Sequence, residues 1–161
     1  MKNITYAGLF IFVLILTKPV FADEDIIAHF KSPQGKSYYA YTGLVSKKDA
    51  GWKDESIKEG ITEIIVNNGN LDVRYVDATK RIMSASEDGG QVKIFGKGIN
   101  TVSILVYYPR HTIEVYNFYT DNDGNIKYIF TQTRSGEDLP IIKSSIYVGS
   151  CDFVYFDKFP E

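Results

Sequence analysis

Apolar and polar residues alternate in short runs along most of the chain. The runs are rich in Tyr, Phe, Val, Ile and Thr, span about five to nine residues, and are separated by clusters of Gly, Asn and Asp. This spacing predicts antiparallel hairpins that follow one another as a meander. The runs that fit strands are 36–44, 62–66, 71–76, 81–86, 91–95, 101–108, 112–120, 126–134 and 141–156.

Turn residues between these runs predict which strands pair. Asn68-Gly69 supplies the positive φ angles of a tight hairpin, so the second and third runs should pair with each other. By the same argument, the turn Glu87–Gly90 predicts that run 81–86 pairs with run 91–95.

Two segments on the N-terminal side favour helix. Glu24–Phe30 places Ile26, Ile27 and Phe30 at helical spacing behind an acidic first turn, which suits the helix dipole. Asp49–Ile61 is longer, but it contains two glycines and few apolar anchors. We expect one or two short helices from these segments.

The strands carry apolar side chains on both faces. Run 101–108 has Val102, Ile104 and Val106 on one side and Leu105 and Tyr107 on the other. Such a sheet either packs against a second layer or curls into a barrel with a lined interior. The predicted fold is therefore mainly β, with about seven to eight antiparallel strands in a curved sheet or partly closed barrel and one or two short N-terminal helices.

The first 22 residues have the pattern of a cleaved secretory signal. Lys2 gives a positive start, residues 7–17 form an apolar core, and Val20-Phe21-Ala22 offers the small residues that signal peptidase needs. We expect residues 1–22 to be removed and 23–161 to form a single exported domain, in the periplasm or outside the cell. No membrane span is expected after cleavage, because the apolar run is shorter than the ~20 residues that cross a bilayer.

The order of strands in this mature chain is similar to the meander of the lipocalin family, and the likeness implies a lipocalin-like barrel. It concerns architecture alone, because no lipocalin signature motif stands at the start of residues 23–161. A likeness of fold carries little weight for function.

Charge argues against nucleic acid as a partner, and the cysteine content argues against an internal disulfide. Without Lys2 and Lys18 the chain has a net charge of about −4, and it lacks the clustered Lys and Arg that bind nucleic acid. Cys151 is the single cysteine and lies in an apolar stretch, so we expect a buried thiol, no internal disulfide and a monomer.

Motifs for cofactors and metals are missing or partial. The sequence has no phosphate-binding Gly-rich loop, HExxH, CxxC or GxSxG, so we expect no cofactor. Asp121, Asp123 and Asn125 resemble part of a calcium loop, but Gln132 stands where the bidentate Glu should be, and the same residues suit a turn. His111 and Glu114 are the candidates for acid and base catalysis, although spacing shows no nucleophile beside them.

Aromatic residues on three consecutive strands provide the strongest functional signal. Tyrosine joins an apolar ring to a polar tip, which suits a wet cavity or an interface. The predicted ligand-binding residues are Tyr116, Phe118 and Tyr128, with Gln132 and Arg134 as polar orienters.

These observations favour an exported, non-enzymatic binding module that holds a small amphipathic ligand. One alternative is an interaction protein, an inhibitor or assembly factor, that uses a strand edge or an aromatic patch. The other is a hydrolase or isomerase that uses His111 and Glu114. The sequence leaves the identity of the ligand open.

Overall fold

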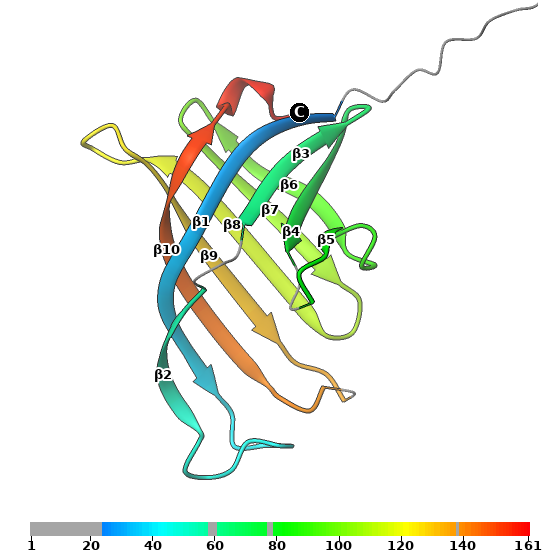
Figure 1. The fold of residues 1–161 in the computed structure, drawn as a ribbon, viewed down its shortest axis with the longest axis vertical. Helices are drawn as coiled ribbons and strands as arrows, with labels where there is room; N and C mark the ends of the chain where they lie inside the picture. Colours follow the sequence, from blue (N-terminus) through cyan, green and yellow to red (C-terminus); the bar gives the residue numbers. More distant parts are fainter. Residues whose placement is uncertain (1–23, 58–60, 77–78, 138) are drawn as a thin grey trace, which may run out of the picture.

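The computed structural model describes residues 24–57, 61–76, 79–137 and 139–161, which form one antiparallel sheet of ten strands. The sheet is curled into a half-barrel (Figure 1). The strands are β1 (Glu24–Tyr39), β2 (Gly51–Ser56), β3 (Ile61–Asn67), β4 (Asn70–Val76), β5 (Ile82–Ser84), β6 (Gln91–Gly98), β7 (Thr101–Tyr108), β8 (Thr112–Thr120), β9 (Ile126–Arg134) and β10 (Lys143–Val154). A short 3-10 helix, Phe156–Lys158, follows β10.

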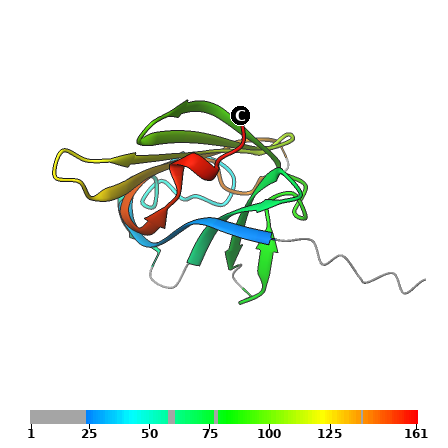
Figure 2. The same ribbon diagram turned by 90° about the horizontal axis from the view of Figure 1, so that it is seen from above.

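Two meanders meet at β1 in the sheet. Strands β3, β4 and β5 follow on one side of β1, and β10 back to β6 follow on the other. The order is β5-β4-β3-β1-β10-β9-β8-β7-β6, so β1 lies between β3 and β10, β5 and β6 are the ends of this order, and β2 lies off it and pairs with β1. Viewed from above, β6 and β7 lie across the interior from β1 and β3 (Figure 2). The sheet thus confirms the predicted curved, partly closed barrel.

Strands β2 and β3 pair with successive lengths of the same edge of β1. Residues Gln34–Tyr39 of β1 pair with β2, and the first half of β1 pairs with β3. The long β1 is therefore covered on both sides along most of its length, since β10 pairs with its other edge. The hairpin predicted at Asn68-Gly69 is present between β3 and β4, and both turn residues have positive φ, 50° and 79°.

The one or two short helices expected on the N-terminal side are not formed: Glu24–Phe30 lies in a strand and so does Gly51–Ser56, so this prediction is wrong. In Glu24–Phe30, a register shift between Ile26 and Ala28 and a second one after His29 set neighbouring apolar residues into the core. Bulges of this kind break the period of two, so the apolar spacing imitates a helix. In the segment Asp49–Ile61, Gly51–Ser56 is extended, and Gly51 has a φ of 100°, outside the helical region. The sheet has ten strands instead of the expected seven or eight, and β2 is the strand that was not among the nine predicted runs.

The predicted pairing of run 81–86 with run 91–95 is also wrong. Strand β5 pairs with β4, and β6 pairs with β7. The turn after β5 is held to β4, because the Ser86 N–H and hydroxyl both donate to the Asp72 carboxylate and the Ala85 N–H donates to the Val73 carbonyl. The seam of the half-barrel, where the strands at the two ends of the order do not pair with each other, therefore lies between β5 and β6.

The core fills the end of the half-barrel nearer the 3-10 helix. Phe30 packs against the rings of Tyr116, Phe118 and Tyr128, with ring centroids 5.9, 5.0 and 4.5 Å away. Other buried members of the core are Ile27, Ile64, Val73, Val102, Ile104, Val154 and Phe159. Cys151 is half-buried and has no disulfide, and burial raises its pKa to about 12, so the thiol stays protonated.

Tyr128→Phe is expected to stabilise the protein by about 1 kcal/mol. The Tyr128 side chain is fully buried, and its hydroxyl has no hydrogen-bond partner within the described residues. A buried polar group without a partner costs about 1–3 kcal/mol, and phenylalanine removes the hydroxyl while keeping the ring. Chemical denaturation measures the change. An unfolding midpoint equal to or below that of the wild type would show that the hydroxyl is satisfied.

Candidate functional site

The interior of the half-barrel changes from apolar to polar along β8 and β9. Inward-facing residues pair across these strands in three rows: Phe118 with Tyr128, Tyr116 with Phe130, and Glu114 with Gln132. A fourth row, Thr112 with Arg134, stands at the strand ends. The two apolar rows belong to the core and form the floor of a cavity at the open end, and the two polar rows beyond them line its wall.

This cavity has a volume of about 390 Å³, within the usual range of about 300–1,000 Å³ for small-molecule pockets. Its walls come from strands on both sides of the half-barrel and from the turns near the seam. They are Ile57, Thr62, Tyr75, Val76, Asp88, Tyr108, His111, Thr112, Glu114, Tyr116, Phe130, Gln132, Arg134 and Leu139. A second cavity, of about 490 Å³, adjoins it and shares Ile57, Phe130 and Gln132 as walls.

Glu114 is a largely buried carboxylate in the wall of the first cavity. Gln132 Nε2 donates to one of its oxygens at 2.7 Å, and the Tyr116 hydroxyl donates to the other at 2.9 Å. Burial raises the pKa of Glu114, while these two hydrogen bonds and the charge of Arg134 oppose the rise. Both direct donors are neutral groups.

Tyrosine hydroxyls connect Glu114's neighbourhood to a second carboxylate. The Tyr75 hydroxyl donates to Asp88 at 2.9 Å and is also hydrogen-bonded to Tyr108. Burial raises the pKa of Tyr75 to about 12 and also raises the pKa values of Tyr108 and Tyr116, so all three phenols stay protonated. The cavity thus presents aromatic faces, hydroxyl oxygens and carboxylates.

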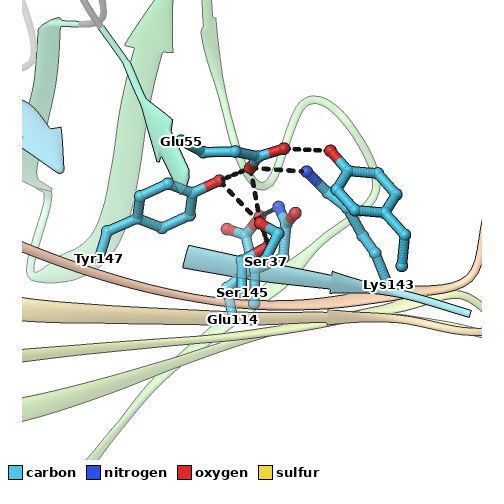
Figure 3. Close-up of polar contacts among 8 residues, drawn as sticks. Ser37, Glu55, Glu114, Lys143, Ser145 and Tyr147 are labelled. Carbon is cyan, nitrogen blue, oxygen red and sulfur yellow. Dashed lines mark hydrogen bonds and ion pairs between the residues drawn. The ribbon is translucent and has the colours of Figure 1, made fainter. Parts of the chain in front are cut away.

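The second cavity contains Glu55 of β2, which is held by several hydrogen bonds (Figure 3). The hydroxyls of Ser37, Tyr39 and Tyr147 donate to its carboxylate, and Lys143 Nζ lies 3.4 Å from Oε2. This cluster ties β2 to β1 and β10. Gly35 lies opposite Glu55 in the pairing of β1 with β2, and it carries no side chain that could intrude.

The Glu55 cluster should make stability depend on acid. Burial raises the pKa of Glu55, but hydrogen bonds from Ser37, Tyr147 and Tyr39 outweigh it and lower the pKa from 4.5 to about 2. A lowered pKa in the folded state stabilises the fold above pH ~4.5, and this contribution is lost as the pH falls towards 2. Screening by solvent limits it to about 1–2 kcal/mol. Denaturation curves from pH 6 to 2 should fall more steeply for wild type than for Glu55→Gln. Parallel curves would assign the acid dependence to other groups.

The structure separates the predicted ligand-binding residues into two groups. Tyr116, Gln132 and Arg134 line the cavity. Phe118 and Tyr128 are fully buried in the core and do not belong to its walls.

The candidate catalytic residues His111 and Glu114 line the same cavity. His111 Nδ1 lies 2.9 Å from Thr112 Oγ1. In the part of the chain that the structure describes, no hydrogen bond or ion pair joins His111 to Glu114.

The candidate calcium residues form the turn between β8 and β9. The Asp121 carboxylate accepts hydrogen bonds from the N–H groups of Asp123 and Asn125 and from the Asn125 amide. These bonds lower the pKa of Asp121, beginning with that from the Asn125 backbone. Among the described residues, no group of three or more His, Cys, Asp or Glu side chains is placed to hold a metal ion.

Several wall residues were outside the sequence-based prediction. Tyr75 and Asp88 come from β4 and the turn after β5, and Glu55 comes from β2. Tyr108 did have a signal in the sequence, because it continues the inward series Val102, Ile104 and Val106 of β7.

The predicted signal segment lies outside the described residues. Within residues 24–57, 61–76, 79–137 and 139–161, no helix has the length and apolar content that crossing a membrane requires. Comparison of the chain with protein-family models, curated proteins and solved structures gave no match.

Proposed function

We propose that this protein is an exported binding module that holds a small amphipathic ligand in the cavity at the open end of the half-barrel. The observation that carries the proposal is the composition of that cavity. Aromatic rings of Tyr75, Tyr108, Tyr116 and Phe130 supply apolar walls, and Glu114, Gln132 and Arg134 supply polar groups that converge on the same space. Small-molecule sites combine these two features.

The position of the cavity also supports binding. The rows of β8 and β9 beneath it are packed core, so the floor is rigid, whereas the outer end is open. A rigid floor reduces the entropy that a protein loses on binding. The export of the mature chain is part of the proposal and rests on the pattern of residues 1–22.

Native mass spectrometry of the exported full chain tests the proposal. Protein purified from the periplasm or medium should carry a bound small molecule, and Thr62→Trp, which fills the cavity, should release it. Thr133→Trp is the matched control, because Thr133 is exposed on β9 and is not a wall residue. Equal retention by both variants would place the ligand elsewhere.

A second candidate function has one specific observation in its favour. Tyr38 of β1 and Trp52 of β2 pack edge to face, with ring centroids 5.5 Å apart, and their side chains are 46% and 66% exposed. Strand β2 pairs with β1 alone in this sheet. An exposed aromatic pair beside a strand edge suits an interaction with another protein. A second polypeptide chain in the same native mass spectrum, in place of a small molecule, would favour this function.

A catalytic role for His111 and Glu114 has less support. Glu114 is engaged by Gln132 and Tyr116, so the carboxylate that would orient or activate the imidazole is directed elsewhere.

A further inference from the structure

We infer that the polar head of the ligand is a cation, an ammonium group on an apolar body, and that Glu114 is its counter-ion. This inference rests on the proposed ligand-binding function and specifies the chemical class of the ligand.

The first observation is that Glu114 forms no ion pair in the described part of the chain, although the charge of Arg134 acts on it from the next row. Its two hydrogen-bond donors, Gln132 and Tyr116, are neutral, and no ion pair to Glu114 is formed within the described residues. Burying an ionised carboxylate is costly unless an opposite charge accompanies it. Burial accordingly raises the pKa of Glu114. A bound cation would supply the missing charge.

Glu55, in the adjoining cavity, provides an internal comparison. It receives three hydroxyl donors and the ammonium group of Lys143, and its pKa is lowered. One carboxylate at this end of the half-barrel is therefore satisfied by the protein itself. Glu114 has two neutral hydrogen-bond donors and, within the described residues, no ion pair.

The second observation is that the walls suit an ammonium group. The rings of Tyr116 and Phe130 stack with centroids 4.6 Å apart, and Tyr75 and Tyr108 line the same space. Aromatic faces attract cations. The hydroxyl of Tyr116 already donates to Glu114, so its oxygen remains as an acceptor for an N–H group.

The third observation is how far Arg134 and Glu114 lie inside the cavity. Arg134, the positive group of the wall, lies in the last row of β8 and β9, opposite Thr112 and Lys143. Glu114 lies one row further in, next to the core rings. A ligand head that enters the cavity thus meets a positive rim and a negative interior, which favours a cation at the inner position.

The test is calorimetric titration of the exported full chain with three six-carbon probes. These are n-hexylammonium, n-hexanol and n-hexanoate. Wild type should bind hexylammonium at least about tenfold more tightly than hexanol, and hexanoate least. Glu114→Gln should weaken hexylammonium binding about tenfold and change hexanol binding less than about twofold. Glu137→Gln, an exposed site that is not a wall residue, should leave all three affinities unchanged.

The outcomes separate this inference from the proposed function. If hexanol or hexanoate binds at least as tightly as hexylammonium, the cation assignment is wrong and the binding function stands. An equal loss for all three probes in Glu114→Gln would show a structural role and also overturn the assignment. If no probe binds wild type, the proposed function fails together with the inference.

A pH series provides a second readout on the unaltered protein. The groups that line the cavity with Glu114 are Tyr116 on its own strand, Gln132 and Arg134 on β9, Tyr108 and His111 on the neighbouring β7 and its turn, and Tyr75 and Asp88 on β4 and the turn after β5. Hexylammonium affinity should fall as acid protonates Glu114, and hexanol affinity should not. Glu114→Gln should remove most of this fall, and His111→Asn should retain it. The same fall in Glu114→Gln would contradict the inference.

Discussion

Gly35→Ala is expected to lower the free energy of unfolding by about 4 kcal/mol. Gly35 lies on β1 where β1 pairs with β10, opposite Tyr147. A Cβ atom at this position would lie 1.9 Å from the Ile146 carbonyl oxygen and 2.7 Å from the Tyr147 Cα. Both are main-chain atoms, so relief requires the two strands to separate. Overpacking costs about 1–3 kcal/mol where side chains can move, and more where they cannot.

Gly96→Ala is the matched control for this substitution. Gly96 is also a strand glycine, but its nearest neighbour, the Ser103 Cβ, lies at an ordinary distance of 3.7 Å. Its effect should stay within about 1 kcal/mol, since the added methyl group meets no obstacle. Chemical denaturation of both variants measures the difference. A loss for Gly35→Ala as small as the one expected for Gly96→Ala would show that β1 and β10 can separate at Gly35 without penalty.

Phe30→Ala is expected to cost about 4 kcal/mol. The side chain is 3% exposed and contacts three rings from β8 and β9. Removing a buried phenylalanine costs about 3–5 kcal/mol, because the cavity left behind closes only in part. Large aromatic neighbours are poorly able to collapse into the gap.

The control is Phe95→Ala, because Phe95 is a strand phenylalanine with 64% of its surface exposed. It should change stability by less than about 1 kcal/mol. Denaturation midpoints with unchanged slopes would measure both effects in one series. A loss below about 2 kcal/mol for Phe30→Ala would indicate that the interior is loosely packed and that the cavity floor is not rigid.

The sequence predicts the part of the fold that depends on local chemistry. The Asn68-Gly69 turn is an example, because its positive φ angles come from the two residues themselves. The predicted helix at Glu24–Phe30 shows the limit. The two register shifts in this part of β1 depend on its pairing with β3 and β10, which begin about 30 and 110 residues later in the chain.

The same limit applies to the candidate site. The alternation of side chains between the two faces of β8 and β9 was sufficient to find Tyr116, Gln132 and Arg134, because inward-facing residues occur at every second position. It also selected Phe118 and Tyr128, which share that face but lie in rows filled by core rings. The depth of a row in a half-barrel depends on how the sheet curls. Glu55 and Lys143 are 88 residues apart, so their contact could be found only from the fold.

The central claim, that the cavity beside Glu114 binds ligand, is tested most directly by an amide NMR titration of the full exported chain with n-hexylammonium and n-hexanol. The account predicts that both probes shift the amide signals of Thr112, Glu114 and Gln132 in the cavity wall. Hexylammonium should shift them at lower concentration. Signals of Tyr38 and Trp52, on the outer face of β1 and β2, should stay in place. Shifts confined to Tyr38 and Trp52, or no saturable shift in the cavity wall, would contradict the account.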